Sequence, residues 1–592
     1  MNFNQRTHTC GELRLSNKGE KVTLNGWIYV KRDLGGLFFV DLRDRYGITQ
    51  IKISPDKKDI YDKISKLNLE SVISTSGTVV ERENKNKNIP TGDIEIDVDN
   101  VEILNESDIT PFVIEENVKA SEDLRLKYRY LDMRREGLAK NIVIRSKVYQ
   151  ATRKYFEKLG FIEIETPILM KSTPEGARDY LVPSRVHKGN FYALPQSPQI
   201  YKQILMVAGF DKYVQICKCF RDEDLRADRQ PEFSQIDFEM SFVRQEDVFE
   251  VLEGLYQTIW KEVLNIDLQT PFIQMTYNDV IEKYGSDKPD LRIPGMEIGN
   301  LNDIFSGSEF KVFQDVINDG GVVSGFKLEG QETSRKLFDE LTEYAKKDLG
   351  FGGLVYIKFN PDGEITSSIK KFLSEAEINK LKEQFNAVDG DVIFILSGKK
   401  KKVLEGLGKL RVKLAHDYNL IDKSQFKFLI VKDFPLFAYD EETGGFVAEH
   451  HMFTMPFDEH LKYLDSKDRT EIESIRAYCY DVVLNGSEIT SGSIRVHRPD
   501  IQKKIFDIVG FPEEEAQKRF GFMLEAFKYG APPHGGAAVG LDRVVAIICG
   551  LDSIRDVIAF PKTIHAASPM DDSPSTVSEQ QLKELGIELS KK

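Results

Sequence analysis

The chain has 592 residues, 41% of them hydrophobic and 30% charged, and its formal net charge is −14. This length predicts roughly three or four domains, because one hydrophobic core rarely serves so many residues. The acidic balance excludes a protein that is basic overall, so any contact with nucleic acid must be local. The longest apolar run, 544–549, is far below the roughly 20 residues that span a bilayer, and the first residues lack the apolar stretch of a signal peptide. We therefore expect a cytoplasmic protein with no membrane segment.

Five strand-like runs follow one another near the start of the chain, at 22–30, 37–42, 48–53, 72–80 and 94–103. Their alternation and the turns between them predict a small closed β-barrel of the oligonucleotide-binding type. Phe38, Val40 and Leu42 would face its core, which leaves Phe39 outward. An outward aromatic on such a barrel is typical of a base-stacking platform, and Gln50, outward on the third strand, would read a base edge. The alternative is that Phe39 is a half-buried rim residue.

The residues after the barrel predict a hinge and then a second domain. Apolar residues recur at helical spacing over 139–159. Pro167 stands at the head of a short apolar strand, a position that is tolerated at a sheet edge or at a subunit interface. Residues 172–180 combine proline and glycine around one central acid, Glu175, and predict a mobile lid.

A helix is expected to begin at the sequence Gln196-Ser-Pro-Gln199. Ser197 has the form of an N-cap and Pro198 of the first helical residue. Gln199 and Lys202 are three positions apart and would therefore lie on one face of this helix.

Residues 213–242 contain a charged loop between two runs in which apolar and polar residues alternate, and this predicts an antiparallel hairpin with one solvent-exposed face. Side chains in a strand point to opposite faces with period two, so Gln235, Asp237 and Glu239 share one face of the return strand. We expect the guanidinium of Arg221, on the first strand, to face this row of acceptors. The alternative is a surface hairpin whose charges are only solvated.

The residue pattern changes between about 294 and 420, where glycine pairs alternate with lysine-rich helices. This predicts an inserted α+β domain, in which we recognise no group of catalytic residues. Strand-like segments return after it. Asp481 and Glu488 border a strand-turn-strand of small residues, and two carboxylates suit hydrated Mg²⁺ bound to phosphate. The glycine-rich segment 530–543 places Arg543 at a helix N-terminus, where an anion is favoured.

Taken together, these sequence motifs resemble those of the class II aminoacyl-tRNA synthetases, and within this class those of the bacterial aspartyl type. The resemblance rests on the Pro167 segment, on Thr173 to Tyr180, on Gln196 to Gln199, on Arg221 to Phe233 and on Gly540 to Arg543. It covers nearly the whole chain. It implies an α+β multidomain fold with an N-terminal OB-fold barrel, an antiparallel catalytic sheet and an inserted domain. The expected bounds are 1–108 for the barrel, 109–140 for the hinge, 141–290 and 427–592 for the two catalytic parts, and 291–426 for the insertion.

The resemblance also implies an activity, an aspartate–tRNA ligase that uses ATP and Mg²⁺. Aspartate would form an adenylate and then be transferred to the 3′ end of tRNA(Asp) by a homodimer. The implied catalytic residues are Arg221, Glu223 and Arg543. The implied aspartate-binding residues are Glu175, Ser197, Gln199, Lys202, Arg221, Asp237, His450 (with His451 as the alternative) and Arg495. The implied ATP-binding residues are Arg221, Asp222, Glu223, Gln230, Phe233, Glu488, Gly540, Leu541, Asp542 and Arg543, with Asp481 and Glu488 holding the metal.

Four barrel residues correspond to the anticodon contacts of the family, namely Arg32, Leu34, Phe39 and Gln50. Relaxed enzymes of the family tend to have histidine where this chain has Leu34, so the resemblance implies selection of tRNA(Asp). The alternative is an enzyme that also charges tRNA(Asn) with aspartate. Two further rivals are a sister synthetase for asparagine, against which Lys202 and Arg495 argue, and a non-catalytic RNA-binding relative, against which the retained Arg221, Glu488 and Arg543 argue.

Overall fold

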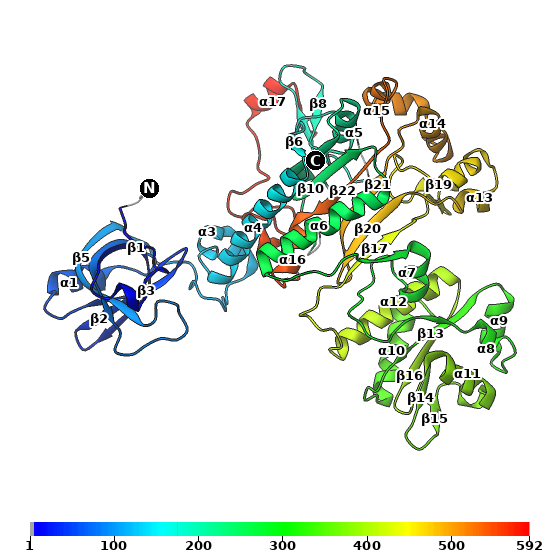
Figure 1. Ribbon diagram of the computed structural model, residues 1–592, viewed down its shortest axis with the longest axis horizontal. Coiled ribbons are helices and arrows are strands. Elements are labelled where there is room, and N and C mark those ends of the chain that lie inside the picture. Colours follow the sequence, from blue (N-terminus) through cyan, green and yellow to red (C-terminus); the bar gives the residue numbers. More distant parts are fainter. Residues whose placement is uncertain (1–4, 174–175, 226–227, 591–592) are drawn as a thin grey trace. The chain divides into compact units, whose positions relative to one another are not determined.

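The computed structural model describes residues 5–173, 176–225 and 228–590, and its contacts divide the chain into two units. The first unit comprises Met1–Val143 together with Ile558–Ser575. The second comprises Ile144–Val557 together with Thr576–Lys592. The chain thus returns to the first unit after passing through the second, as its colours show in Figure 1.

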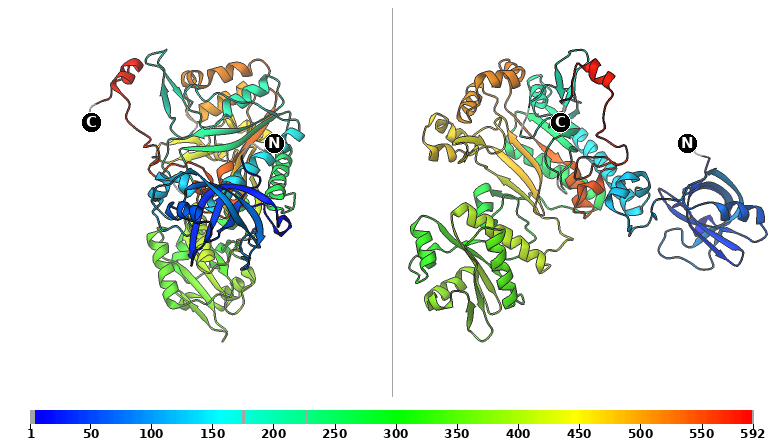
Figure 2. Two further views of the ribbon diagram at one scale, coloured as in Figure 1. Left: turned by 90° about the vertical axis from the view of Figure 1, so that its left-hand side faces the viewer. Right: turned by 180° about the vertical axis from the view of Figure 1, so that it is seen from behind.

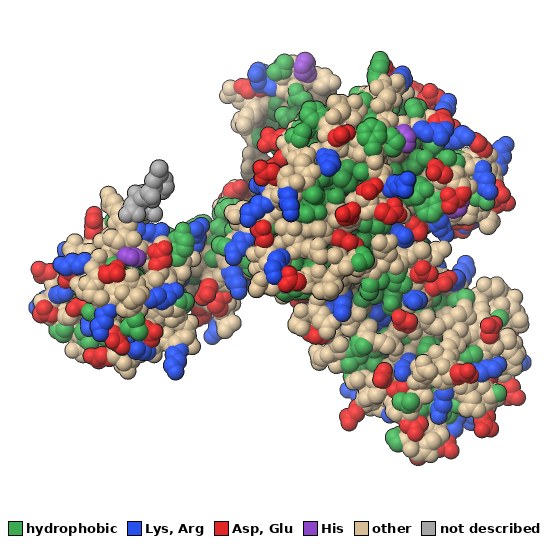
Figure 3. All heavy atoms as spheres, in the orientation of Figure 1, with side chains coloured by type: hydrophobic (Ala, Val, Ile, Leu, Met, Phe, Trp, Pro, Cys, Tyr) green, Lys and Arg blue, Asp and Glu red, His purple; other side chains and the backbone are tan. Residues whose placement is uncertain are grey.

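The first unit contains the predicted five-stranded barrel, which is closed in the order β1-β2-β3-β5-β4. Its strands are β1 (Lys21–Leu34), β2 (Leu37–Asp44), β3 (Gly47–Ile53), β4 (Val72–Glu81) and β5 (Ile94–Asn105). Phe38, Val40 and Leu42 are buried in its core, as the alternation predicted. One helix that the sequence did not indicate, α1 (Lys58–Lys66), packs Tyr61 edge-on against Phe38. Charged side chains of both signs are interspersed over the barrel surface in Figure 3.

The hinge follows the barrel and contains α2 (Glu122–Lys127), α3 (Arg129–Asp132) and the start of α4 (Glu136–Lys158). Arg129 in α3 is buried and donates to the carbonyls of Ile558 and Ala559, so the hinge holds the returning chain segment of the same unit. Helix α4 confirms the helical spacing of residues 139–159.

The second unit is built on an eight-stranded sheet in the order β11-β17-β20-β21-β22-β10-β9-β6. The six inner strands are antiparallel, as the sequence led us to expect, and one parallel strand is added at each edge. The strands are β6 (Ile162–Glu163), β9 (Lys212–Phe220), β10 (Glu232–Ser241), β11 (Ile273–Thr276), β17 (Phe428–Lys432), β20 (Cys479–Leu484), β21 (Ser487–Ile494) and β22 (His534–Gly540). Two small sheets pair β7 (Leu181–Pro183) with β8 (Phe191–Ala193) and β18 (Phe437–Asp440) with β19 (Gly445–Ala448).

Outside the insertion, the second unit also contains the helices α5 (Gln199–Val207), α6 (Gln245–Leu264), α7 (Tyr277–Tyr284), α13 (Arg469–Glu473), α14 (Pro499–Ile508), α15 (Glu513–Phe527), α16 (Leu541–Ile548) and α17 (Glu579–Leu585). Helix α17 lies apart from the sheet, after a long extended segment (red in Figure 2). Helix α5 begins one residue later than predicted, because Pro198 is the N-cap and Ser197 Oγ accepts from the Gln199 amide outside the helix. Among the described helices, none is both long and apolar enough to cross a bilayer.

The prediction that Pro167 heads a strand was wrong. Strand β6 ends at Glu163, the Ile164 amide still donates to the Val214 carbonyl of β9, and the chain then leaves the sheet. The reason lies in the backbone of Thr166, whose amide donates to the side chain of Gln215 rather than to a strand carbonyl. Ile168 and Leu169 are consequently exposed.

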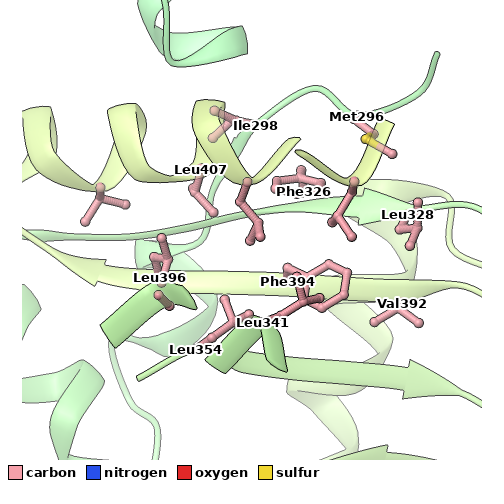
Figure 4. Close-up of a cluster of buried hydrophobic side chains, with 14 of the residues drawn as sticks. Met296, Ile298, Phe326, Leu328, Leu341, Leu354, Val392, Phe394, Leu396 and Leu407 are labelled. Atoms are coloured by element: carbon pink, nitrogen blue, oxygen red, sulfur yellow. The ribbon is translucent and has the colours of Figure 1, made fainter. Parts of the chain in front are cut away.

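The inserted region forms its own three-layer sandwich around a five-stranded sheet in the order β12-β13-β16-β14-β15. The strands are β12 (Gly299–Asn300), β13 (Val322–Leu328), β14 (Val355–Phe359), β15 (Ile365–Ser367) and β16 (Val392–Gly398). The helices are α8 (Asn302–Phe305), α9 (Lys311–Asn318), α10 (Arg335–Lys347), α11 (Glu375–Phe385) and α12 (Lys400–Asp417). Phe394 and Leu396 of β16 pack against α10 and α12, as Figure 4 shows, whereas Ile393 and Ile395 belong to the core on the other face. This alternation is what a central strand requires.

Candidate active site

A cavity of about 1660 Å³ opens over the sheet of the second unit. Its walls come from α5, the β9–β10 hairpin, the β20–β21 hairpin and the junction of β22 with α16. Most of the predicted catalytic-unit residues line it, namely Ser197, Gln199, Lys202, Arg221, Glu223, Gln230, Phe233, Asp237, His450, Glu488, Arg495, Gly540, Asp542 and Arg543. Glu175 lies outside the described residues.

Two predicted ATP-binding residues do not line the cavity. Leu541 is fully buried in the core. Asp222 follows the end of β9, where its backbone forms a bridge with Arg178. The contacts of these two residues with ATP stay predictions.

Four buried charges lie together at the cavity, where Lys202, Asp237 and Arg495 line it and Glu239 contacts two of them. The ammonium of Lys202 lies 2.7 Å from Asp237 and 3.2 Å from Glu239. Glu239 also accepts from two nitrogens of Arg495, at 2.9 and 3.3 Å. Each of the four side chains is at most 3% exposed, and their charges balance. Removing one member would leave a buried charge without its partner, which is costly.

The predicted row of acceptors for Arg221 was therefore assigned to the wrong cation. Asp237 and Glu239 serve Lys202 and Arg495, while the Arg221 guanidinium lies 5.1 Å from the centre of the Phe233 ring. Alternation along the hairpin placed the acids on one face correctly, but a cation from α5 and another from the residue after β21 reach that face. Glu239 was not among the predicted aspartate-binding residues. Its position two residues after Asp237 on the same strand could have indicated that it belongs to the site.

The ionisation of these acids follows from burial and from their partners. Burial raises the pKa of Asp237 to about 6, although the nearby Lys202 ammonium acts in the opposite direction. Burial also disfavours ionised Glu239, but Arg495 and Lys202 outweigh it and hold the pKa of this carboxyl below its ordinary value. One oxygen of Asp237, Oδ2, has no hydrogen-bond partner among the described residues. A buried acceptor in this state is available to a ligand that brings a donor.

His451, rather than its neighbour His450, lies against Arg495. Its Nε2 is 3.0 Å from Arg495 Nη1, and its Nδ1 accepts from the Phe453 amide. Burial and the Arg495 cation keep the pKa of His451 well below its ordinary value, so the ring is neutral. The contact of His451 Nε2 with Arg495 Nη1 is a hydrogen bond, so His451 and Glu239 together hold the guanidinium of Arg495 in place. His450 also lines the cavity and packs edge-on against Phe434.

Asp542 lines the cavity but is committed to holding the fold. One carboxylate oxygen accepts from Arg145 Nη1 at 2.5 Å, and the other accepts from the Ser234 amide at 2.7 Å. Both oxygens thus have strong partners. Its neighbour Arg543, in the first turn of α16, instead points to the cavity and donates to the Glu488 carbonyl and to Asp228.

The two predicted metal ligands lie on adjacent strands. Glu488 lines the cavity, whereas Asp481 is buried behind it and its Oδ1 has no hydrogen-bond partner among the described residues. Burial, and then repulsion from Glu488, raise the pKa of Asp481 to about 7 against the opposing effect of His450. No cluster of three or more candidate ligands occurs in the part of the chain that the structure describes. A cation here would need further oxygens from a substrate, as Mg²⁺ bound to phosphates has.

The barrel carries a separate polar site, within the first unit. Arg32 makes a two-pronged ion pair with Asp41 and also donates to Gln50 Oε1 at 3.1 Å. The Gln50 amide donates in turn to Glu95 at 2.6 Å. Gln50 is outward in phase but only 5% exposed, because these two neighbours cover it, and this corrects the expectation of an open side chain. Phe39 is paired with Arg32 across the strands and is half-buried. Glu95, which fixes the Gln50 amide, was not anticipated.

Comparisons with known proteins agree with this geometry. The sequence model of the family "tRNA synthetases class II (D, K and N)" matches residues 121–564, and that of the "OB-fold nucleic acid binding domain" matches 22–104. The chain therefore belongs to the class II aminoacyl-tRNA synthetases of this group.

Two curated relatives narrow the family further. The aspartate–tRNA(Asp/Asn) ligase of Caldanaerobacter subterraneus subsp. tengcongensis is 52% identical, covering 99% of this chain and 98% of the relative. The aspartate–tRNA ligase of Clostridium perfringens is 51% identical over 100% and 98%. Within the class, the chain is thus a member of the aspartate–tRNA ligases.

Solved structures share the fold at low sequence identity. A putative aspartyl-tRNA synthetase from Leishmania major Friedlin has a TM-score of 0.60 at 19% identity, covering 97% of this chain and 96% of the other. The asparaginyl-tRNA synthetase of Pyrococcus horikoshii with asparaginyl-adenylate has a TM-score of 0.58 at 20% identity, over 94% and 98%.

Proposed function

We propose that the protein activates L-aspartate with ATP and transfers the aspartyl group to the 3′ end of tRNA(Asp). The observation that carries this proposal is the Arg495 guanidinium, which lines the cavity and is held by Glu239 and His451. The side-chain carboxylate of aspartate supplies a charged acceptor for this guanidinium. The side-chain amide of asparagine can also accept through its oxygen, but it carries no negative charge to neutralise the guanidinium. The site therefore favours aspartate over asparagine.

The α-ammonium of the substrate has an acceptor in the unpartnered Oδ2 of Asp237. Lys202 holds the other oxygen of this carboxylate and keeps it oriented. Gln199 and Ser197, at the start of α5, line the same end of the cavity. The amino acid would thus be held at both ends, with its α-carboxylate free to react.

The reaction needs positioning rather than a protein nucleophile. The α-carboxylate oxygen attacks the α-phosphorus of ATP, and pyrophosphate leaves with the bonding electron pair. Arg221, beside the Phe233 ring, would neutralise charge on the carboxylate and the α-phosphate, and Phe233 would stack on adenine. Glu223 and Gln230 would order the nucleotide, and Arg543 would cover its other side.

Asp481 and Glu488 fit Mg²⁺, because Asp481 offers an unpartnered oxygen and the two acids repel each other when both are ionised. When bound, the ion would neutralise phosphate charge. These two side chains would hold it together with oxygens of ATP.

The barrel would bind the tRNA anticodon through Arg32, Leu34, Phe39 and Gln50. The network from Arg32 through Gln50 to Glu95 fixes the orientation of the Gln50 amide. Leu34 is exposed at the turn between β1 and β2.

A homodimer is the proposed assembly. Several large apolar side chains are exposed on and after the edge strand β6, namely Ile162, Ile168, Leu169, Leu181 and Phe191. Exposed apolar groups of this kind indicate a protein interface. Sedimentation velocity should give twice the mass of the chain, and Ile168→Asp together with Leu169→Asp should shift it to the monomer.

The test of the activity is pyrophosphate exchange with aspartate and with asparagine. We expect exchange with aspartate alone. Arg495→Leu should abolish it while ATP binding remains measurable by calorimetry. Exchange that is equal for both amino acids, or an unimpaired variant, would refute the proposal.

A further inference from the structure

A short segment, 287–292, passes the cavity on its way from α7 into the inserted region, and it carries a lysine that the site described above does not use. Lys288 lines the cavity and is about half exposed. Its Nζ lies 3.9 Å from Glu488 Oε2 and 3.6 Å from Asp287 Oδ2. Arg543 donates to the backbone carbonyl of Glu488, so two cations contact this residue.

The inserted helix α12 anchors the chain just before this segment. A Cβ on Gly285 would lie 2.0 Å from the carbonyl oxygen of Leu404, and a Cβ on Gly408 would lie 2.7 Å from the carbonyl oxygen of Gly285. The two backbones thus touch, and only glycine fits at either position. Gly285 also has φ +66°, a conformation that favours glycine.

The same helix anchors the segment again through Arg411. Its guanidinium is 1% exposed, donates through Nη2 to the Asp290 carbonyl at 3.1 Å and lies 4.8 Å from the Tyr284 ring centre. Residues 404, 408 and 411 follow the spacing of one helix face. Arg411 forms no ion pair among the described residues, and its Nε has no hydrogen-bond partner there. A buried cation in this state costs stability, so its presence calls for a role beyond packing.

Asp290 transmits this anchoring to the hairpin that carries Glu488. Its carboxylate is held by Arg292 through the backbone amide at 2.9 Å and the guanidinium at 2.8 Å. Its Cβ lies 3.2 Å from the place of a Cβ on Gly486, the residue with φ +83° in the β20–β21 turn. Lys288 and Glu488 are therefore fixed relative to each other through Asp290.

We propose that Lys288 contacts the phosphate chain of ATP and that Arg411 is a positioning residue that holds Lys288 there. This inference rests on the proposed function. As the carboxylate–phosphorus bond forms and the bond to pyrophosphate breaks, negative charge grows on the leaving pyrophosphate, and a lysine ammonium is a compact charge suited to it. The inserted region would then support the ATP site through a single helix face.

The first test compares Lys288→Met with Lys288→Arg in pyrophosphate exchange. The methionine variant should raise KM for ATP and for pyrophosphate roughly tenfold and leave KM for aspartate within about twofold. Arginine should restore most of the loss. Lys261→Met is the matched control, since Lys261 is similarly exposed on α6 and pairs only with Asp267 among the described residues. Unchanged ATP and pyrophosphate KM values in Lys288→Met would overturn the assignment.

The second test is a double-mutant cycle with Arg411→Met. If Arg411 acts through Lys288, the double variant should be no worse in KM for ATP than Lys288→Met alone. Additive effects would overturn the positioning role, and so would equal changes in the KM values for ATP and aspartate. Arg411→Lys keeps the charge and serves as the second variant if the methionine protein does not fold.

Failure of the proposed function is distinguishable from failure of this inference. A native protein without aspartate-dependent exchange would refute the former. Calorimetric binding of ATP with Mg²⁺, without any amino acid, then tests Lys288 alone, and equal affinity of the native protein and Lys288→Met would refute the latter.

Discussion

Arg495 and Glu239 form a two-pronged ion pair in which both side chains are essentially removed from solvent. Glu239 also holds Lys202, so one carboxylate orients both cations of the aspartate site. Glu239→Gln should therefore raise KM for aspartate by at least tenfold and lower the free energy of unfolding by about 3 to 5 kcal/mol, because two buried cations lose their counter-charge. Urea unfolding and exchange kinetics measure the two effects. A variant of native stability and affinity would show that Glu239 does not have this role.

The pH dependence of aspartate binding should report Asp237, whose pKa burial raises to about 6. Its neighbours are Lys202, Glu239, Arg495 and Tyr213. Below about pH 6 the carboxyl becomes neutral and accepts the substrate ammonium less well, so KM for aspartate should rise as the pH falls. The effect on stability has the opposite sign. Because the folded pKa exceeds the unfolded one, this group's contribution to stability is present below about pH 4 and is lost as the pH rises through 6.

Asp237→Asn is the control for this titration. Its KM for aspartate should be high at every pH and flat near pH 6. A slope that persists in the variant would assign the titration to another group.

The metal requirement should depend on Glu488. Glu488→Gln and Asp481→Asn each remove one negative ligand from a hard cation, so the Mg²⁺ concentration at half-maximal exchange should rise several-fold. Glu513→Gln, an exposed acid on α15, is the control. Identical midpoints in all three variants would mean that the two acids are structural.

Contacts between residues far apart in the sequence are the part of the site that could not be predicted. The barrel and the β9–β10 hairpin were predictable because alternation is local and shows which residues share a face. The pairing of Arg495 with Glu239 joins positions 256 residues apart, and no local pattern specifies it. The same holds for Asp222 and Leu541, because each is the neighbour of a cavity residue but does not itself line the cavity. The sequence motifs of the family identified which segments form the site more reliably than they predicted where each side chain points.

Anticodon recognition should depend on Phe39. Phe39→Ala should lower the efficiency of tRNA charging roughly tenfold or more, because stacking on one base contributes about 1 to 3 kcal/mol. Aspartate-dependent pyrophosphate exchange should be unchanged, since the barrel folds around a core of its own. Equal loss in both assays would assign Phe39 to folding.

Selection between tRNA(Asp) and tRNA(Asn) should depend on the turn that carries Leu34. An exposed leucine offers no donor or acceptor to a base, so polar groups of the wrong base would stay unpaired. We expect charging of tRNA(Asp) alone and relaxed charging of tRNA(Asn) by Leu34→His. The relatives named above include both kinds of ligase, so the assay with both pure tRNAs decides. Comparable charging of tRNA(Asn) by the native protein would refute the prediction.

Arg129 in the hinge binds carbonyls that lie 429 and 430 residues further along the chain. At a synthesis rate of about 5 to 20 residues per second, the ribosome needs roughly 20 to 90 seconds to make the intervening chain. During that interval Arg129 lacks the two carbonyls of the returning segment that it binds in the folded protein, while the barrel before it can already close. The nascent chain should therefore acquire its barrel early and its hinge last. A fragment that ends at residue 143 should accordingly have a stable barrel followed by a protease-sensitive tail.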